Sequence, residues 1–304
     1  MTMRISIAQI RSTNRLSFNF SVCEKLIKQA AEKQANLICF PECFAFIGSS
    51  IGETLENARP LNSDLFDSYR NLAKKYQIHV SYGGFHEVCS EKKIYNSHVL
   101  VNNKGEIVNV YRKVHLFDLN TEKVKLRESD VTEFGKELLV DDDGALFSKD
   151  LIVGLSICYD LRFPELYILQ RKLRNVKIML VPAAFTKHTG ELGHWKTLLQ
   201  ARAIENQCYV VAAAQVGRHN QKRESFGHSL IIDPLGKILL DLGQQEETYN
   251  LELQEKESFE GVLGVVDMDD WPAVLEKVRE GMPVFDHKRS DLYEIITTST
   301  KRKD

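Results

Sequence analysis

Two short and predominantly apolar runs, residues 36–40 and 151–157, set strict limits on how this chain of 304 residues folds. The first run ends at Pro41 and the second at Cys158. Such runs are typical of β-strands buried on both faces, because a strand with one face in water alternates apolar and polar side chains. The chain must therefore cover both faces of at least one sheet.

Periodicity elsewhere in the sequence predicts what covers the sheet. Alternating or apolar runs predict strands over residues 3–10, 36–40, 78–82, 95–101, 106–111, 151–157, 177–181, 208–214, 226–232, 237–240 and 261–267. Apolar side chains at helical spacing predict helices over 16–30, 63–76, 194–206 and 273–280, with another from Pro164. Residues 118–150 are charged and lack periodicity, which predicts a long loop with short extended pieces. Buried strands alternating with helices predict an α/β fold with a mixed sheet, or two sheets, between helical layers.

Length and composition bear on domain number. Hydrophobic residues make up 43% of the chain and charged residues 27%, which is typical of a globular protein with ample core. A chain of this length forms one large domain or two ordinary ones. The sequence has no internal repeat and no linker rich in Pro or Gly. We therefore expect a single domain over 1–296, followed by a polar tail over 297–304.

Charge and cysteine usage exclude several classes of function. Forty basic against 42 acidic residues leave a net charge of −2, so nothing favours binding to nucleic acid or to a membrane surface. No apolar run approaches the roughly 18 residues that span a bilayer. The start, MTMRISIAQIRST, is too charged for a signal peptide. Six scattered cysteines predict free thiols in a reducing compartment, and hence a cytoplasmic protein.

Three reactive side chains follow predicted strands, where ligand sites of α/β sheets form. Cys158 lies on a sharp turn between a strand and a helix, and a helix N-terminus favours the thiolate. A small buried hydrophobe is the alternative reading of Cys158. Glu42 follows Pro41, and its burial predicts a raised proton affinity, which suits a general base or acid; alternatively it is an ordinary loop glutamate. The alternative for Lys113 is an ordinary solvated cation, one of the 40 Lys and Arg residues of the chain.

Other patterns give weaker signals. Cys39 and Cys43 have CxxxC spacing but no second pair at zinc-finger distance. The pair Gly83-Gly84 and the pair Gly190 and Gly193 lack the Lys-Ser/Thr of a phosphate loop. We therefore expect neither a metal ion nor an organic cofactor. A protease-like dyad of Cys158 with His115 or His194 stays open from the residues alone.

The strand ends also carry longer motifs. Pro41-Glu42, the segment YRKVHLFD over 111–118 and the segment GLSICYDLRFPE over 154–165 resemble the three motif blocks of the nitrilase superfamily, the carbon–nitrogen hydrolases. Their order and spacing fit as well. Residues 208–236 are similar to the branch called Nit, whose members act as deaminated glutathione amidases. The sequence departs from that branch at Phe226 and Leu235, where other aromatic residues are usual.

The resemblance implies a four-layer αββα sandwich that pairs with a second copy through its helical face. It implies a catalytic triad of Glu42, Lys113 and Cys158, and it matches the family's second glutamate to Glu128. The branch's substrate carries carboxylates, which Arg162 would bind as a bidentate partner. A helix cap or a surface salt bridge is the alternative for Arg162. Three more residues are expected at the substrate: Tyr159, through its backbone N–H, together with Phe185 and Thr186.

The resemblance also implies an activity. The branch hydrolyses the amide of deaminated glutathione to 2-oxoglutarate and cysteinylglycine, a metabolite repair reaction. Within the superfamily, an ω-amidase acting on 2-oxoglutaramate and an N-carbamoyl amidohydrolase are the alternatives. A binding or scaffold protein on a retained enzyme fold is an alternative from another class, since a fold does not determine a function.

Overall fold

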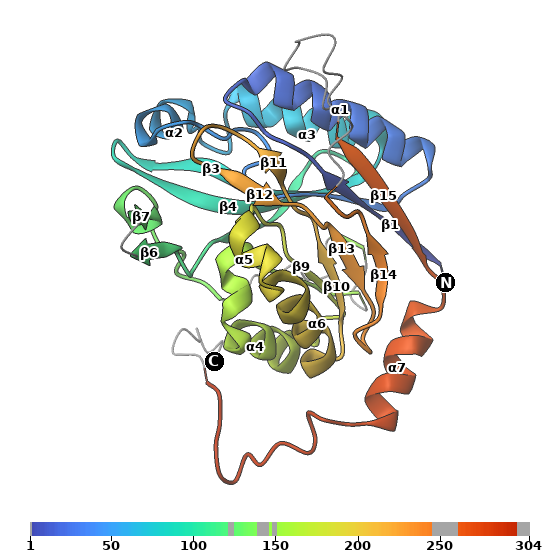
Figure 1. Ribbon diagram of the computed structural model, residues 1–304. Coiled ribbons are helices and arrows are strands. Elements are labelled where there is room, and N and C mark those ends of the chain that lie inside the picture. Colours follow the sequence, from blue (N-terminus) through green and yellow to red (C-terminus); the bar gives the residue numbers. More distant parts are fainter. Residues whose placement is uncertain (1, 121–124, 139–145, 148–150, 245–260, 297–304) are drawn as a thin grey trace, which may run out of the picture.

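Two β-sheets lie face to face at the centre of the molecule, with helices on both outer sides (Figure 1). The computed structural model describes residues 2–120, 125–138, 146–147, 151–244 and 261–296. The sheets contain parallel and antiparallel neighbours, so the fold is an αββα sandwich with mixed sheets. The predicted polar tail over 297–304 lies outside the described residues.

The first sheet has six strands, and its central strands are parallel. Its order is β15 (Val262–Met268), β1 (Met3–Gln9), β2 (Leu37–Phe40), β3 (His79–Ser90), β4 (Lys93–Val101) and β5 (Ile107–Arg112). β1, β2 and β3 run parallel, while β4 is antiparallel to both β3 and β5. β2 and β5 therefore point the same way, and their carboxyl ends lie at the same edge of the sheet.

The second sheet has five strands in the order β14 (Ile238–Asp241), β13 (Leu230–Ile232), β10 (Tyr209–Ala212), β9 (Ile178–Leu180) and β8 (Val153–Leu155). β8, β9 and β10 are parallel, and β13 and β14 return antiparallel. Isolated bridges between Ile10 and Gln215 and between Ala183 and Ala214 lie beyond the strand ends. The first of them joins a residue after β1 to one after β10.

Helices α1 (Leu16–Glu32) and α3 (Asp64–Tyr76) cover the six-stranded sheet, while α4 (Pro164–Arg174) and α6 (His194–Asn206) cover the other (Figure 1). The remaining elements are α2 (Ile51–Asn57), α5 (Lys187–Glu191), α7 (Trp271–Gly281), the 3-10 helices η1 (Glu128–Asp130) and η2 (Cys158–Arg162), and the strand pairs β6 (Asp118–Asn120) with β7 (Lys125–Arg127) and β11 (Val216–Arg218) with β12 (Glu224–Phe226). Within the described residues, no helix is long and apolar enough to cross a membrane.

The side-chain period of a strand divides the core between the two faces of the six-stranded sheet. In β2, Leu37 and Cys39 face the second sheet, while Ile38 and Phe40 pack with α1 and α3. All four residues are buried, as the apolar run predicted. A strand with both faces covered cannot carry a polar residue in its middle without a partner, so its first ionisable side chain comes after its end.

Most predicted elements are confirmed, and two differ in extent. The strand predicted over 78–82 continues to Ser90, with a register shift between Tyr82 and Phe85 that accommodates the glycine pair. The strand predicted over 226–232 is interrupted, because Gly227 and His228 have positive φ angles of 79° and 55°. Such angles cannot continue a strand.

Candidate active site

The ends of β2, β5 and β8 bring Glu42, Lys113 and Cys158 together, although the three strands come from two different sheets. The Lys113 ammonium donates to Oε1 of Glu42 over 3.0 Å. The Cys158 thiol is hydrogen-bonded to the Glu42 carboxylate. Glu42 and Lys113 are almost fully buried, whereas Cys158 is half-buried. Glu42 is therefore the link between the cation and the sulfur.

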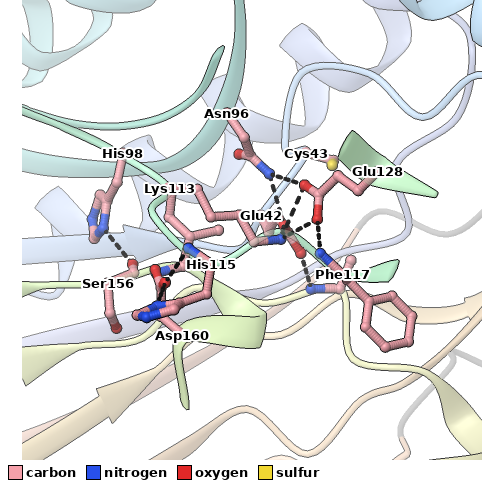
Figure 2. A network of polar contacts seen from close by, with 12 residues as sticks. Glu42, Cys43, Asn96, His98, Lys113, His115, Phe117, Glu128, Ser156 and Asp160 are labelled. Atoms are coloured by element: carbon pink, nitrogen blue, oxygen red, sulfur yellow. Dashed lines mark hydrogen bonds and ion pairs between the residues drawn. The ribbon is translucent and has the colours of Figure 1, made fainter. Parts of the chain in front are cut away.

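Glu128 completes the charged cluster around Lys113 (Figure 2). The Lys113 ammonium lies 3.1 Å from Oε1 and 2.9 Å from Oε2 of Glu128. Glu128 is the first residue of η1, and its Oε2 also accepts the backbone N–H of Phe117 over 2.7 Å. Burial lowers the pKa of Lys113, but the carboxylates of Glu128 and Glu42 outweigh it, and the pKa lies well above its usual value. Lys113 is thus a permanently charged cation held between two carboxylates.

Besides Lys113, Asn96 of β4 also links the two carboxylates, and sequence reasoning did not single it out. Its Nδ2 donates to Oε1 of Glu42 over 2.8 Å and to Oε1 of Glu128 over 3.3 Å (Figure 2). The other oxygen of Glu42 accepts the backbone N–H of Ala184 over 2.9 Å. A buried asparagine on a strand with apolar neighbours is the signal that points to such a role.

The prediction that Glu42 has a raised proton affinity is wrong. Burial does raise the pKa of this carboxyl, but the charges of Lys113 and Arg223, with hydrogen bonds from Lys113 and the Ala184 amide, lower it to about 2. Glu42 is therefore a carboxylate in the resting site. The sequence position of Glu42 revealed the burial, but it could not reveal two cations from distant parts of the chain.

Cys158 sits on a strained turn, as its place between a strand and a helix predicted. Its φ angle is 46°, in the left-handed region that costs a residue with a side chain about 1–3 kcal/mol. Its backbone N–H donates to the carbonyl of Pro182 over 2.9 Å. The expected resting thiolate is not what the site favours: burial and the Glu42 carboxylate raise the pKa of Cys158 well above its usual value, against the opposing charge of Lys113. The sulfur rests as a thiol that donates to Glu42.

Asp160 holds this turn in place, and sequence reasoning missed it. Its Oδ2 accepts the Ile157 backbone N–H and the Tyr111 hydroxyl, each over 2.8 Å. Its Oδ1 is bonded to the backbone N–H and Nδ1 of His115, at 3.1 and 2.7 Å (Figure 2). Asp160 therefore joins the end of β5 and the segment after it, which includes Lys113, to the turn that carries Cys158. An aspartate two residues beyond a turn that leaves a strand is the local signal for this role.

The two predicted Cys–His dyads gain no support from the geometry. His115 is engaged with Asp160 and stacks on Phe163 at 3.7 Å between ring centroids. Nδ1 of His194 accepts a hydrogen bond from Nη2 of Arg162 over 3.3 Å. Among the described residues, no hydrogen bond joins either imidazole to Cys158. Glu42 takes the place beside the sulfur that a dyad would give to histidine.

The residues predicted to bind substrate lie on and beside η2. Tyr159 packs against Phe117, with 5.0 Å between ring centroids. The Arg162 guanidinium lies over the rings of Tyr159 and Phe185, at 5.9 and 5.6 Å. In the part of the chain that the structure describes, Arg162 forms no ion pair with a carboxylate. The alternative of a surface salt bridge therefore does not apply, and the charge of Arg162 is available for a ligand.

Phe185 and Thr186 lie beside β12. Phe185 is buried against Trp195, with 5.0 Å between ring centroids, and its carbonyl accepts the backbone N–H of Phe226 over 2.9 Å. Thr186 is exposed at the start of α5 and forms an isolated bridge with Ser225. The structure thus places Thr186 at the surface and Phe185 in the wall behind Arg162.

The weaker sequence patterns have structural explanations. Cys39 and Cys43 are both buried, and Cys43 Sγ contacts Nε2 of His86 at 3.5 Å. Within the described residues, no cluster of three His, Cys, Asp or Glu side chains is arranged to hold a metal ion. Gly84 has a φ angle of 66°, and a Cβ there would lie 2.7 Å from Cγ of Glu42. The glycine pair therefore allows the close approach of β3 to Glu42.

The two departures from the Nit pattern differ in burial. Phe226 is buried, stacks on His228 with 4.5 Å between ring centroids, and lies against the backbone of Gly190. Leu235 is 65% exposed in the turn between β13 and β14. Among the described residues, no hydrogen bond or ring contact joins either residue to Glu42, Lys113 or Glu128.

Arg223 is a further cation near the cluster that site prediction did not single out. It lies between β11 and β12, and its Nη2 is 3.9 Å from Sγ of Cys43, the residue that follows Glu42. Its charge lowers the pKa of Glu42. The sequence signal was weak, because arginines in hairpin loops are usually solvated.

Known proteins match this chain along nearly its whole length. The carbon–nitrogen hydrolase family matches residues 4–257. A deaminated glutathione amidase of Dictyostelium discoideum is 45% identical, with 96% of each chain covered. The human deaminated glutathione amidase is 38% identical over 95% of this chain and 83% of that protein. The crystal structure of the Caenorhabditis elegans NitFhit protein has a TM-score of 0.82 at 38% identity, covering 97% of this chain and 66% of that longer one.

Proposed function

Because the chain belongs to the carbon–nitrogen hydrolase family, we propose that it hydrolyses the amide of deaminated glutathione to 2-oxoglutarate and cysteinylglycine. The observation that carries this proposal is the Cys158 thiol bonded to a Glu42 carboxylate, which is itself paired with Lys113. Amide hydrolysis needs a nucleophile, a proton carrier and a cation near the developing oxyanion. These three groups supply one of each. The two deaminated glutathione amidases above support the choice of substrate.

In the acylation half-reaction, Cys158 Sγ attacks the amide carbon and its proton passes to Glu42. The carbonyl π electrons move to oxygen, where the Lys113 ammonium and the backbone N–H of Tyr159 stabilise the oxyanion. When the carbonyl re-forms, the C–N bond breaks and Glu42 gives its proton to the nitrogen. The low pKa of Glu42 makes its protonated form a strong acid toward an amine. Cysteinylglycine leaves, and a 2-oxoglutaryl thioester remains on Cys158.

Deacylation reverses the roles with water as the nucleophile. Glu42, again a carboxylate, takes a proton from water as the water oxygen attacks the thioester carbon. The C–S bond then breaks, and the sulfur recovers the proton from Glu42. The products are 2-oxoglutarate and the free thiol, so one water is consumed for each amide cleaved. Lys113 stays protonated throughout, because Glu42 and Glu128 both hold its pKa high.

Glu128 acts by holding Lys113 rather than by carrying protons in this scheme. Its two oxygens both contact the Lys113 ammonium, and the Phe117 N–H fixes its carboxylate. On the substrate side, the charge of Arg162 would pair with the carboxylate of the 2-oxo acid. Phe185 forms the apolar wall beneath Arg162, while Thr186 stands at its exposed edge.

A substrate comparison tests the proposed function. The wild-type protein and Cys158→Ala are assayed with deaminated glutathione and with 2-oxoglutaramate at equal concentrations. We expect the larger kcat/KM for deaminated glutathione and no turnover by Cys158→Ala. A larger kcat/KM for 2-oxoglutaramate would make the chain an ω-amidase, and no turnover of either would favour a binding protein. Full activity in Cys158→Ala would remove the thioester mechanism.

We also propose a homodimer formed through the outer helices. Leu173 of α4 is 44% exposed and Ile204 of α6 is 52% exposed, and these helices pack side by side on the second sheet. Sedimentation equilibrium tests this, with Leu173→Lys expected to weaken association.

We propose that the protein is located in the cytoplasm. The six free cysteines support this location, because thiols stay reduced in a reducing compartment.

A further inference from the structure

Hydrogen bonds within the loop between β11 and β12 fix the backbone of Arg223. His219 donates its backbone N–H to the carbonyl of Arg223 over 3.0 Å, which closes the loop. The Asn220 side chain accepts the Arg223 backbone N–H over 3.0 Å and donates to the carbonyl of Gly48 over 3.1 Å. Nδ1 of His219 is 2.9 Å from the carbonyl of Ser12. The loop is thus hydrogen-bonded to the segment that precedes α1 and to the segment between β2 and α2.

The charge of Arg223 has no ion-pair partner among the described residues. Its Nη2 contacts Sγ of Cys43 at 3.9 Å, and Cys43 in turn contacts His86. Burial raises the pKa of Cys43 to about 12 and lowers that of His86 to about 4, so both are uncharged near neutral pH. The Glu42 carboxylate acts on Arg223 through its charge, but within the described residues no hydrogen bond joins the two side chains. The guanidinium therefore keeps N–H donors that a carboxylate of a ligand can use.

Arg223 and Arg162 approach the reacting groups from different elements. Arg162 belongs to η2 and lies over Tyr159 and Phe185. Arg223 lies beside Cys43, which directly follows Glu42. In the part of the chain that the structure describes, Arg162 and Arg223 both lack a carboxylate in ion-pair contact, and the one on the Glu42 side is Arg223.

Deaminated glutathione has two carboxylates, one at each end of the molecule. The first belongs to the 2-oxoglutaryl group, which stays on Cys158 as the thioester. The second belongs to the glycine of the leaving group. Because Glu42 protonates the leaving nitrogen, the leaving group lies on the Glu42 side of the scissile bond. That is the side on which Arg223 stands.

We propose that Arg223 binds the carboxylate of the leaving cysteinylglycine and so selects amides with a carboxylate on both sides of the scissile bond. This inference rests on the proposed function. It makes Arg223 a specificity residue, whereas Arg162 serves the acyl side. An alternative is that Arg223 acts only by keeping Glu42 ionised, and the two roles differ in how they depend on the substrate.

The test compares deaminated glutathione with its glycinamide, in which only the leaving-group carboxylate is changed to a carboxamide. For the wild-type protein we expect kcat/KM to be about 10- to 100-fold higher for the acid, mostly through KM, as for a charge-assisted pair. In Arg223→Gln we expect that ratio to fall to within about 3-fold. Arg223→Lys, which keeps the charge but not the bidentate fork, should give an intermediate ratio. Arg218→Gln is the matched control, because Arg218 lies on the same hairpin with its side chain 72% exposed, and it should keep the wild-type ratio.

Each result decides the proposal. A wild-type ratio near one overturns it without any variant. An equal loss on both substrates in Arg223→Gln overturns it too, because Arg223 would then act through Glu42. If the wild-type protein cleaves both substrates, the proposed function stands whatever the ratio. If it cleaves neither, the proposed function and the role of Arg223 both fall.

Discussion

The Lys113 ammonium lies 3.0 Å from Oε1 of Glu42, and the two side chains are only 2% and 4% exposed. Removing two charges from water costs several kcal/mol per ion, and their attraction repays that cost only with good geometry and further hydrogen bonds. A well-packed apolar pair would stabilise the fold at least as well. The ion pair is therefore better explained by chemistry than by stability, since the proposed mechanism uses the same two groups for the proton transfer and the oxyanion.

Replacing Lys113 should affect both rate and stability. Lys113→Met removes the cation that faces the oxyanion, and we expect kcat/KM to fall by at least about 10²–10³-fold. It also leaves the buried carboxylate of Glu42 and the partly buried carboxylate of Glu128 without their shared cation, which should lower the free energy of unfolding by about 3–5 kcal/mol. Steady-state kinetics and urea unfolding measure the two effects.

A second variant separates these effects. Adding Glu128→Gln to Lys113→Met removes one unpaired carboxylate, so we expect part of the stability to return while activity stays lost. If Lys113→Met retained a rate within a few-fold of the wild-type protein, Lys113 would have no role at the oxyanion.

Asn96 should be a positioning residue for both carboxylates. Asn96→Leu keeps the volume but removes the donor that joins Glu42 to Glu128. We expect kcat to fall by about 10- to 100-fold with KM changing little, because the lost bonds orient Glu42 rather than substrate. A change confined to KM would instead place Asn96 at the substrate.

Gly84 should be required for the approach of its strand to Glu42. In Gly84→Ala the new Cβ would meet Cγ of Glu42 at 2.7 Å on a backbone with φ at 66°. We expect activity to be lost, with a fall in the free energy of unfolding beyond the roughly 1 kcal/mol that a left-handed alanine costs.

Gly243→Ala is the matched control for Gly84→Ala. Gly243 has a φ angle of 64°, and no atom of the described residues lies within 4 Å of an added Cβ. It should show the backbone cost alone, measured by urea unfolding, with the amidase rate preserved. Equal behaviour of the two variants would mean that crowding at Glu42 is unimportant.

The pH dependence of the reaction should distinguish Glu42 from a histidine base. Glu42 must be ionised to accept the thiol proton, so the active fraction falls only as the pH drops through its pKa of about 2. The raised pKa of Cys158 keeps the thiol protonated as the pH rises through the usual thiol range. We therefore expect kcat/KM to stay level between about pH 5 and 8. A Cys–His dyad would instead lose rate below an inflection near the imidazole pKa of about 6.5.

The architecture followed from local patterns wherever local forces decide it. The stripe from Leu16 to Ala30 predicted α1, and the apolar runs predicted β2 and β8, because burial of these side chains is what forms the elements. The strand predicted over 226–232 was wrong at Gly227 and His228, where the bond from the His228 N–H to the Gly243 carbonyl draws the chain aside. A partner so distant in sequence leaves no local trace.

The site divides in the same way. Strand ends pointed to Glu42, Lys113 and Cys158, but only the resemblance to a family singled out Glu128 from a charged loop. Asn96, Asp160 and Arg223 emerged from the structure alone, because their roles depend on contacts between segments that are far apart in the chain. The reversed expectation for the pKa of Glu42 has the same origin.

The central claim is that Cys158 carries the acyl group during turnover. Acid quenching of the wild-type protein during steady-state hydrolysis of deaminated glutathione, followed by peptide mass spectrometry, tests it most directly. We predict a 2-oxoglutaryl group on the peptide that contains Cys158, and none in Cys158→Ala. Turnover with no acylated cysteine, or with the group on any of the other five cysteines, would contradict the account.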